Sequence, residues 1–315
     1  MNVFQNIINN HEIILTEGAL AERLKKEYKL KMDDSINHAG IIYEAPAVIE
    51  NIYRQYLDIA EKYDLPVMIM TPTRRVNTDS LRNSKFYKKE IISDSCRFLN
   101  QIKYSYSKYS TKILTGGLLG CIGDAYSGKQ IMNIEEAYAF HKQQTKQFQF
   151  QDINFLFAGI MPEINEAVGL AKAAAETGFP YIISFMIRKD GCLLDGTFIA
   201  EAIQMIDEQA GPKPSFYMTN CIHPTNLIRA LMAGENLEHP SIKRLIGIQA
   251  NTSTLSPEEL NNSGIVHQDD FDNIINEMLV LRKDFNFKIF GGCCGTNEKF
   301  IEMMSEKLKS NIHIN

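Results

Sequence analysis

The segment Phe287-Lys288-Ile289-Phe290-Gly291-Gly292-Cys293-Cys294-Gly295-Thr296 joins a short apolar run to a stretch with helical spacing. The run Phe287–Phe290 predicts a buried strand, and the amphipathic spacing of Thr296–Leu308 predicts a helix after it. Three glycines and two adjacent cysteines connect the two elements. The segment therefore predicts a strand–helix unit whose connecting loop carries unusual side chains.

The same alternation of strand and helix recurs towards the N-terminus. Seven further apolar runs are candidate strands: Glu12–Leu15, Val67–Met70, Lys112–Leu114, Phe155–Ala158, Tyr181–Phe185, Phe216–Met218 and Leu245–Ile248. Helices are expected at Glu90–Ile102, at Glu166–Glu176, and after Ser256, which would cap a helix with Pro257 in its first turn. Strands that alternate with helices favour parallel βα units.

Eight such units would close into a (β/α)8 TIM barrel, which needs about 250 residues plus insertions. We therefore expect an α/β protein in which residues 1–315 form a single TIM barrel domain. The alternative with this alternation is an open doubly wound sheet. No Gly-x-Gly-x-x-Gly motif follows the first predicted strand, so a dinucleotide-binding sheet of that kind is disfavoured.

Composition narrows the class of protein and its compartment. Of 315 residues, 44% are hydrophobic and 23% are charged, which is typical of a globular protein with a sizeable core. The net charge of -5 leaves no basic surface that would favour a nucleic-acid or membrane partner. The N-terminal residues lack the pattern of a signal peptide, so we expect a cytoplasmic protein. The oligomeric state stays open, a homo-oligomer included.

In a reducing compartment, the six cysteines are expected to be buried small residues, metal ligands or reactive thiols. The glycines around Cys293 and Cys294 free the backbone to turn, so both sulfurs could meet one ion. Cys221 follows the sixth predicted strand, and both loops would lie at the C-terminal face of a barrel, where active sites form. His223 is a competing ligand, although Pro224 indicates that the chain turns there. Core packing is the alternative for any single cysteine.

Three thiolates with an open fourth position are typical of a catalytic rather than a structural zinc site. Such a centre carries net negative charge and is a poor Lewis acid for a carbonyl, but a soft thiol can still bind and lose its proton. A free thiol, with a pKa of about 8.5, is mostly protonated at neutral pH. The cysteine pattern therefore favours thiol alkylation. A metal hydrolase is disfavoured, because hydrolytic zinc prefers histidine and carboxylate ligands.

Several motifs occur in a recognisable order along the chain: Glu17-Gly18-Ala19, Met161-Pro162-Glu163-Ile164-Asn165-Glu166-Ala167, Leu194-Asp195-Gly196-Thr197, Asn220-Cys221 and Gly291-Gly292-Cys293-Cys294-Gly295-Thr296. Together they resemble the homocysteine S-methyltransferase family. The resemblance implies a zinc-dependent TIM barrel in which Cys221, Cys293 and Cys294 hold Zn2+ while the thiolate of homocysteine attacks an activated methyl group, a step of methionine biosynthesis. It also implies a small-molecule thiol acceptor and a methyl donor as partners.

The donor is expected to be a small sulfonium or ammonium compound, such as S-methylmethionine, S-adenosylmethionine or betaine, because the chain has no room for folate and cobalamin modules. Two departures concern the acceptor. Glu17 stands where the family usually has aspartate, and Gly159 stands where a glutamate helps to hold the amino-acid substrate. Loss of a carboxylate that faces an ammonium group costs about 2–5 kcal/mol. Unless Glu17 or another acid compensates, ordinary homocysteine would bind poorly, so the expected acceptor is homocysteine or a related thiol. The alternative is a zinc-binding barrel that has lost methyl transfer and acts as a binding or regulatory protein.

Residues at the ends of the predicted strands complete the expected site. The expected substrate contacts are Glu17, Gly18, Thr71, Ser184 and Asn220. Arg74 and Arg75 follow the second predicted strand, and a guanidinium group can make bidentate contacts to a carboxylate or phosphate. We therefore hold as a hypothesis that Arg74 or Arg75 recognises an acidic group on the substrate.

Overall fold

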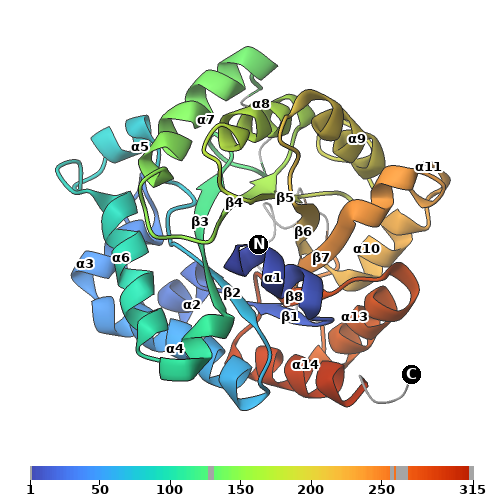
Figure 1. The fold of residues 1–315 in the computed structure, drawn as a ribbon, viewed down its shortest axis with the longest axis horizontal. Helices are drawn as coiled ribbons and strands as arrows, with labels where there is room; N and C mark the ends of the chain where they lie inside the picture. The colour runs from blue at the N-terminus through green and yellow to red at the C-terminus, as the bar shows by residue number, and fades with distance from the viewer. Residues whose placement is uncertain (1, 127–130, 256–258, 260–268, 312–315) are drawn as a thin grey trace.

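The computed structural model describes residues 2–126, 131–255, 259 and 269–311. Eight parallel strands form a closed barrel in which each strand pairs with the next and β8 pairs with β1 (Figure 1). The strands are β1 (Ile14–Thr16), β2 (Val67–Met70), β3 (Ile113–Gly120), β4 (Phe155–Met161), β5 (Tyr181–Phe185), β6 (Phe216–Ile222), β7 (Leu245–Ala250) and β8 (Ile289–Gly292). The predicted (β/α)8 TIM barrel is confirmed.

Helices surround the barrel as an outer ring (Figure 1). The described α-helices are α1 (Val3–Asn10), α2 (Ala21–Lys26), α3 (Ile41–Glu44), α4 (Pro46–Lys62), α5 (Thr78–Arg82), α6 (Ile91–Tyr104), α7 (Ile134–Phe148), α8 (Ile164–Ala175), α9 (Ile199–Gln209), α10 (Pro224–Leu231), α11 (Gly234–Leu237), α13 (Phe271–Phe285) and α14 (Glu298–Ser310). Short 3-10 helices lie at His38–Gly40, Ser107–Lys112 and Pro240–Arg244. The predictions for α6, α8 and α14 are confirmed, whereas the helix expected after Ser256 lies outside the described residues. None of the described helices combines the length and the hydropathy that a membrane crossing requires.

The third strand is longer than its apolar run. The sequence predicts an end at Leu114, but β3 continues to Gly120. A β-carbon at Gly116 would lie 2.4 Å from the ring of Phe155 on β4, so the strand needs glycine there to pass the ring. Glycine ordinarily signals a loop, but here it permits close packing within the barrel.

The N-terminal end of the barrel is closed by α1. This helix lies across the centre of the barrel in Figure 1. Its Phe4 ring lies 5.4 Å from the ring of Phe155 and 6.1 Å from that of Phe216, both inside the barrel. Ile7 and Ile8 of α1 are buried in the same apolar cluster. An access route to the barrel interior is therefore left at the opposite, C-terminal end.

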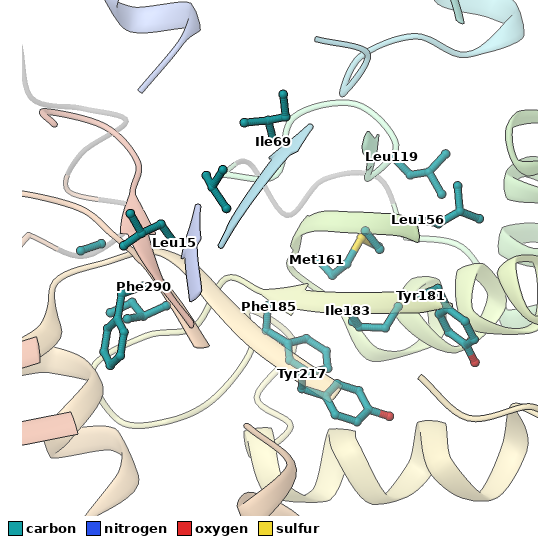
Figure 2. Packing of buried hydrophobic residues seen from close by; sticks show 14 of the residues in the cluster. Leu15, Ile69, Leu119, Leu156, Met161, Tyr181, Ile183, Phe185, Tyr217 and Phe290 are labelled. Atoms are coloured by element: carbon teal, nitrogen blue, oxygen red, sulfur yellow. The ribbon is translucent and has the colours of Figure 1, made fainter. Parts of the chain in front are cut away.

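The outward-facing side chains of the strands pack beneath the helices. Figure 2 shows Leu15, Ile69, Tyr181, Phe185 and Tyr217 among the residues of this cluster. The rings of Phe185 and Tyr217, on adjacent strands, stack with centroids 5.8 Å apart. Because the strands are buried on both faces, each contains an apolar run, as expected for a parallel sheet.

Candidate metal centre

Three cysteine side chains meet at the C-terminal end of the barrel. The sulfurs of Cys221, Cys293 and Cys294 all lie within 4.8 Å of one another. In the described part of the chain they are the one group of three or more potential metal-binding side chains that lie this close together. Three sulfurs bound tetrahedrally to one zinc at about 2.3 Å would lie slightly closer than this, so the arrangement fits a metal ion of that size.

Cys221 occupies a β-bulge within β6. The pairing of β6 with β7 shifts between Asn220 and Ile222, and Cys221 has a φ of 58°. This corrects the prediction that Cys221 lies in the loop after the sixth strand. A bulge turns the side chain of its extra residue away from the regular alternation, and a left-handed residue other than glycine costs about 1–3 kcal/mol. The neighbouring strands therefore hold Cys221 in a strained conformation that aims its sulfur at the other two.

A second bulge lies alongside the first. The pairing of β4 with β5 shifts between Ala158 and Met161, and Ile160 has a φ of 59°. The side-chain oxygen of Asn220 accepts hydrogen bonds from the backbone N–H of Ile160 at 3.1 Å and from the hydroxyl of Ser184 at 2.7 Å. Asn220 therefore ties β4, β5 and β6 together beside the sulfurs.

The loop after β8 brings in the other two cysteines. The N–H of Cys293 donates to the carbonyl of Ala250 at 2.7 Å, and the N–H of Thr252 donates to the carbonyl of Cys294 at 3.2 Å. Gly295 has a φ of 83°, and a β-carbon there would lie 1.8 Å from Oγ1 of Thr252. The loop can therefore lie against β7 only with glycine at this position, which supports the role that the sequence assigned to the flanking glycines.

The three thiols differ in the direction in which their pKa values are shifted. Hydrogen bonds from Cys293 and Cys294 hold the pKa of Cys221 well below its usual range. The contact with Cys221 raises the pKa of Cys293 strongly and that of Cys294 to about 12, because further thiolates would add negative charge beside the first. A divalent cation among the sulfurs would remove that penalty, so the donor set fits a soft metal ion such as zinc.

Tyr126 reaches the sulfurs from the loop after β3. Its hydroxyl hydrogen-bonds to Cys221, which lowers the pKa of that thiol further. Burial raises the pKa of Tyr126 well above its usual range, so the phenol keeps its proton and donates it. The sequence gave no indication of this contact, because Tyr126 stands in a connection without a motif.

A cavity of about 190 Å³ opens beside the sulfurs. Its lining includes the three cysteines together with Glu17, Gly18, Thr71, Asn220, Gly159, Arg74, His38, Gln249 and Tyr126. Four of the five expected substrate contacts therefore border it. Ser184 is fully buried and lies outside the lining, behind Asn220. His38, Gln249 and Tyr126 belong to no sequence motif and were not expected there.

Glu17 is buried in the wall of this cavity. One of its carboxyl oxygens accepts a hydrogen bond from the N–H of Met70 at 2.8 Å, and no described Lys or Arg forms an ion pair with it. Burial raises the pKa of Glu17 to about 8 against the lowering effect of that hydrogen bond. The acid is therefore mostly neutral at pH 7, and an ammonium group placed beside it would favour its carboxylate form.

Two other candidate residues take structural positions. His223 lies at the start of α10, where its Nδ1 accepts a hydrogen bond from the N–H of Thr225 at 3.2 Å, and it does not join the sulfur group. Arg75 pairs with Asp124 at 4.0 Å and does not line the cavity. Of the two arginines singled out in the sequence, Arg74 alone borders the site.

Comparison with known proteins identifies the family. A sequence model described as "Homocysteine S-methyltransferase" matches residues 14–308. The chain belongs to the homocysteine S-methyltransferase family. The resemblance drawn from the motifs is thereby confirmed.

Two relatives in this family match along almost all of the chain. Homocysteine S-methyltransferase YbgG from Bacillus subtilis (strain 168) is 22% identical over 324 residues, covering 98% of this chain and 99% of YbgG. Betaine–homocysteine S-methyltransferase 1 from Bos taurus is 21% identical over 319 residues, covering 96% of this chain and 73% of the relative.

The fold is similar to that of solved structures. The metallated form of the homocysteine methyltransferase MmuM from Escherichia coli has a TM-score of 0.76 at 19% identity, covering 97% of this chain and 100% of that one. The oxidised form of the same protein has a TM-score of 0.75 at 18% identity, covering 98% of this chain and 100% of that one. These likenesses show that the barrel is shared.

Proposed function

We propose that this protein is a zinc-dependent S-methyltransferase that moves a methyl group from a small sulfonium or ammonium donor to homocysteine or a related thiol. The observation that carries the proposal is the convergence of three sulfurs within 4.8 Å at the mouth of the barrel. Membership of the family supports thiol methylation. In this proposal residues 1–315 act as one domain.

Cys221, Cys293 and Cys294 would hold Zn2+, with the bulge of β6 and the glycine turn after β8 positioning their sulfurs. Zinc on three thiolates supplies a fourth position at which an incoming thiol loses its proton near neutral pH. The hydroxyl of Tyr126 stabilises the negative charge on Cys221 by donating a hydrogen bond to it. Asn220 ties β6 to the bulge of β4 beside this group by accepting a hydrogen bond from the N–H of Ile160.

The cavity residues would bind and orient the two substrates. Glu17 would pair with an ammonium group, while Gly18 and Thr71 form neighbouring parts of the wall. The substrate sulfur attacks the methyl carbon, the new sulfur–carbon bond forms as the bond from that carbon to the donor breaks, and the bonding electrons leave with the donor. An anion and a cation thus become neutral products, which a site poor in water favours. Apolar side chains of Met70, Leu118 and Phe157 line the cavity and keep water away.

The test combines metal analysis with a substrate screen. We expect stoichiometric zinc in the wild-type protein and in Cys96→Ala, a buried cysteine of α6 outside the sulfur group, and loss of zinc in Cys221→Ala, Cys293→Ala and Cys294→Ala. Mass spectrometry of thiols incubated with S-methylmethionine, S-adenosylmethionine or betaine should detect a methylated product only with zinc-loaded protein. Zinc that survives all three changes would contradict the proposed ligands.

A binding or regulatory barrel is the second candidate. Glu17 is mostly neutral at pH 7, and Gly159 supplies no carboxylate to the cavity. The cavity therefore offers less negative charge to the ammonium group of an amino-acid substrate. Zinc retained together with absence of turnover across the whole screen would favour this second candidate.

A further inference from the structure

Arg74 is a cation in the wall of the candidate site that pairs with none of the described residues. Of the acidic groups that line the cavity, Glu22 accepts a hydrogen bond from the N–H of Gly295 at 2.6 Å and pairs with Lys26, and Glu17 accepts one from the N–H of Met70. Arg74 lines the same cavity, and its guanidinium makes no hydrogen bond or ion pair with any residue that the structure describes. A cation without a counter-ion in such a cavity is available to a ligand.

The backbone around Arg74 is held in place. The hydroxyl of Thr71 accepts a hydrogen bond from the N–H of Leu118 at 3.0 Å, and the hydroxyl of Thr73 donates to the carbonyl of Leu118 at 2.7 Å. A β-carbon at Gly120 would lie 2.7 Å from Cγ of Arg74 and 2.4 Å from its carbonyl oxygen. The stem of Arg74 therefore lies directly against the end of β3.

Arg74 lines the cavity together with the three cysteines and His38. After burial, the positive charge of Arg74 helps to lower the pKa of His38 to about 3, so that this cavity residue is neutral. The charge of Arg74 is therefore felt by another group in the cavity wall.

We propose that Arg74 binds the carboxylate of a substrate in this cavity, so that the site prefers molecules that carry a carboxylate. The inference rests on the proposed function for the identity of those molecules as a thiol acceptor or a methyl donor. A planar guanidinium can bind both oxygens of a carboxylate, which a point charge cannot do. Arg74 and Glu17 together offer a cation and an acid to one small ligand, as the two charges of an amino acid require.

A competing role for Arg74 is to balance the negative charge of three thiolates. That role predicts a different pattern, because every thiol and the metal itself would be affected whether or not the ligand carries a carboxylate. A comparison of ligands that differ only in the carboxylate separates the two roles.

The experiment measures direct binding to zinc-loaded protein by calorimetry. The thiol probes are homocysteine, 4-sulfanylbutanoate, which lacks the amino group, and 3-aminopropane-1-thiol, which lacks the carboxylate. The donor probes are S-methylmethionine and its carboxamide. Proteins compared are the wild type, Arg74→Gln, Arg74→Lys, Arg75→Gln and Arg97→Gln, the last a solvent-exposed arginine of α6 that controls for net charge.

We expect Arg74→Gln to weaken binding of the carboxylate-bearing probes about 10- to 100-fold, the range of a charge-assisted hydrogen bond, and to leave 3-aminopropane-1-thiol within about twofold. Arg74→Lys should restore binding in part, and Arg75→Gln and Arg97→Gln should match the wild type. Loss confined to the thiol series assigns the carboxylate to the acceptor, and loss confined to the donor series assigns it to the donor.

Equal weakening of probes with and without a carboxylate, a fall in zinc content, or a wild type that shows no preference for carboxylates would overturn the inference. Its failure is distinct from failure of the proposed function. Methyl transfer without carboxylate dependence leaves the function intact and removes the role of Arg74. Carboxylate-dependent binding that disappears in Arg74→Gln, without any methyl transfer, supports the role of Arg74 and contradicts the proposed function.

Discussion

The two ends of the barrel are built in different ways. At the N-terminal end, a regular helix places Phe4 against the rings of Phe155 and Phe216. At the C-terminal end, left-handed residues in two strands, Ile160 and Cys221, interrupt the regular ladder and border the cavity beside the sulfurs. The contrast teaches that regular packing stabilises this barrel, whereas an irregular backbone places the side chains of the candidate site.

The largest expected effect is on stability at the N-terminal end. Phe4 is 1% exposed, so Phe4→Ala should lower the free energy of unfolding by about 3–5 kcal/mol through lost burial and a cavity. Urea denaturation measures this change, and Phe150→Ala, at a residue 89% exposed, is the matched control. Zinc content should stay at the wild-type level in both variants. A coupled loss of zinc would show that the two ends do not act separately.

A cost to stability is expected from the acid in the cavity wall. Below pH 4.5 Glu17 is protonated in both the folded and unfolded states, but between that pH and about 8 the unfolded state alone loses the proton, so stability falls as pH rises. Glu17→Gln should therefore raise the free energy of unfolding at pH 8 by a few kcal/mol, since each pKa unit corresponds to about 1.4 kcal/mol, and flatten its pH dependence. Denaturation at several pH values checks this.

Glu12→Gln is the control for Glu17→Gln, because the side chain of Glu12 is 76% exposed. The same Glu17→Gln variant should bind amino-bearing thiols more weakly than the wild type. A variant that is less stable than the wild type at pH 8 would contradict the neutral, buried state of Glu17.

A smaller effect is expected at the sulfur group. Tyr126→Phe removes the hydrogen bond to Cys221 and should weaken zinc binding about 10-fold, as observed for groups that support metal ligands. Competition with a zinc chelator measures the change, and Tyr87→Phe, at an exposed tyrosine, is the control. Unchanged zinc affinity would mean that the phenol does not support the metal site.

The smallest effect separates a structural from a substrate role. Ser184→Ala removes the donor to Asn220 at 2.7 Å and should cost about 1 kcal/mol of stability, since Ile160 still donates to the same oxygen. The KM for the thiol should stay unchanged, because Ser184 does not line the cavity. A raised KM at unchanged stability would return Ser184 to the substrate contacts expected from the sequence.

The sequence predicted the strands because both faces of each are buried, so each appears as an apolar run. It located strand ends less well. In β3, glycines that read as a loop remain in the strand, where a β-carbon at Gly116 would meet Phe155. In β6, the polar residues Thr219 and Asn220 still pair with β7, as does Ile222, so Cys221 lies within the strand.

Residues of the candidate site were predicted from the sequence only where they stand in a local motif. Cys293 and Cys294 stand between glycines and were assigned from that pattern, and Cys221 was added by its place after a strand. Tyr126 and His38 had no such signal, because their contacts come from loops brought together by closure of the barrel. The same closure places Arg74 at the cavity and Arg75 outside it, a distinction between neighbours that no spacing rule could make.

By itself, the sequence determined the class of fold and the chemical type of the site. Apolar periodicity is local, and thiols keep their affinity for soft metals in any fold. Only the tertiary structure decided which side chains share one cavity, how Cys221 turns inward at a bulge, and that burial leaves Glu17 mostly neutral at pH 7 while Arg74 stays unpaired among the described residues. Those properties depend on distance and desolvation, which arise when strands remote in the chain close into one barrel.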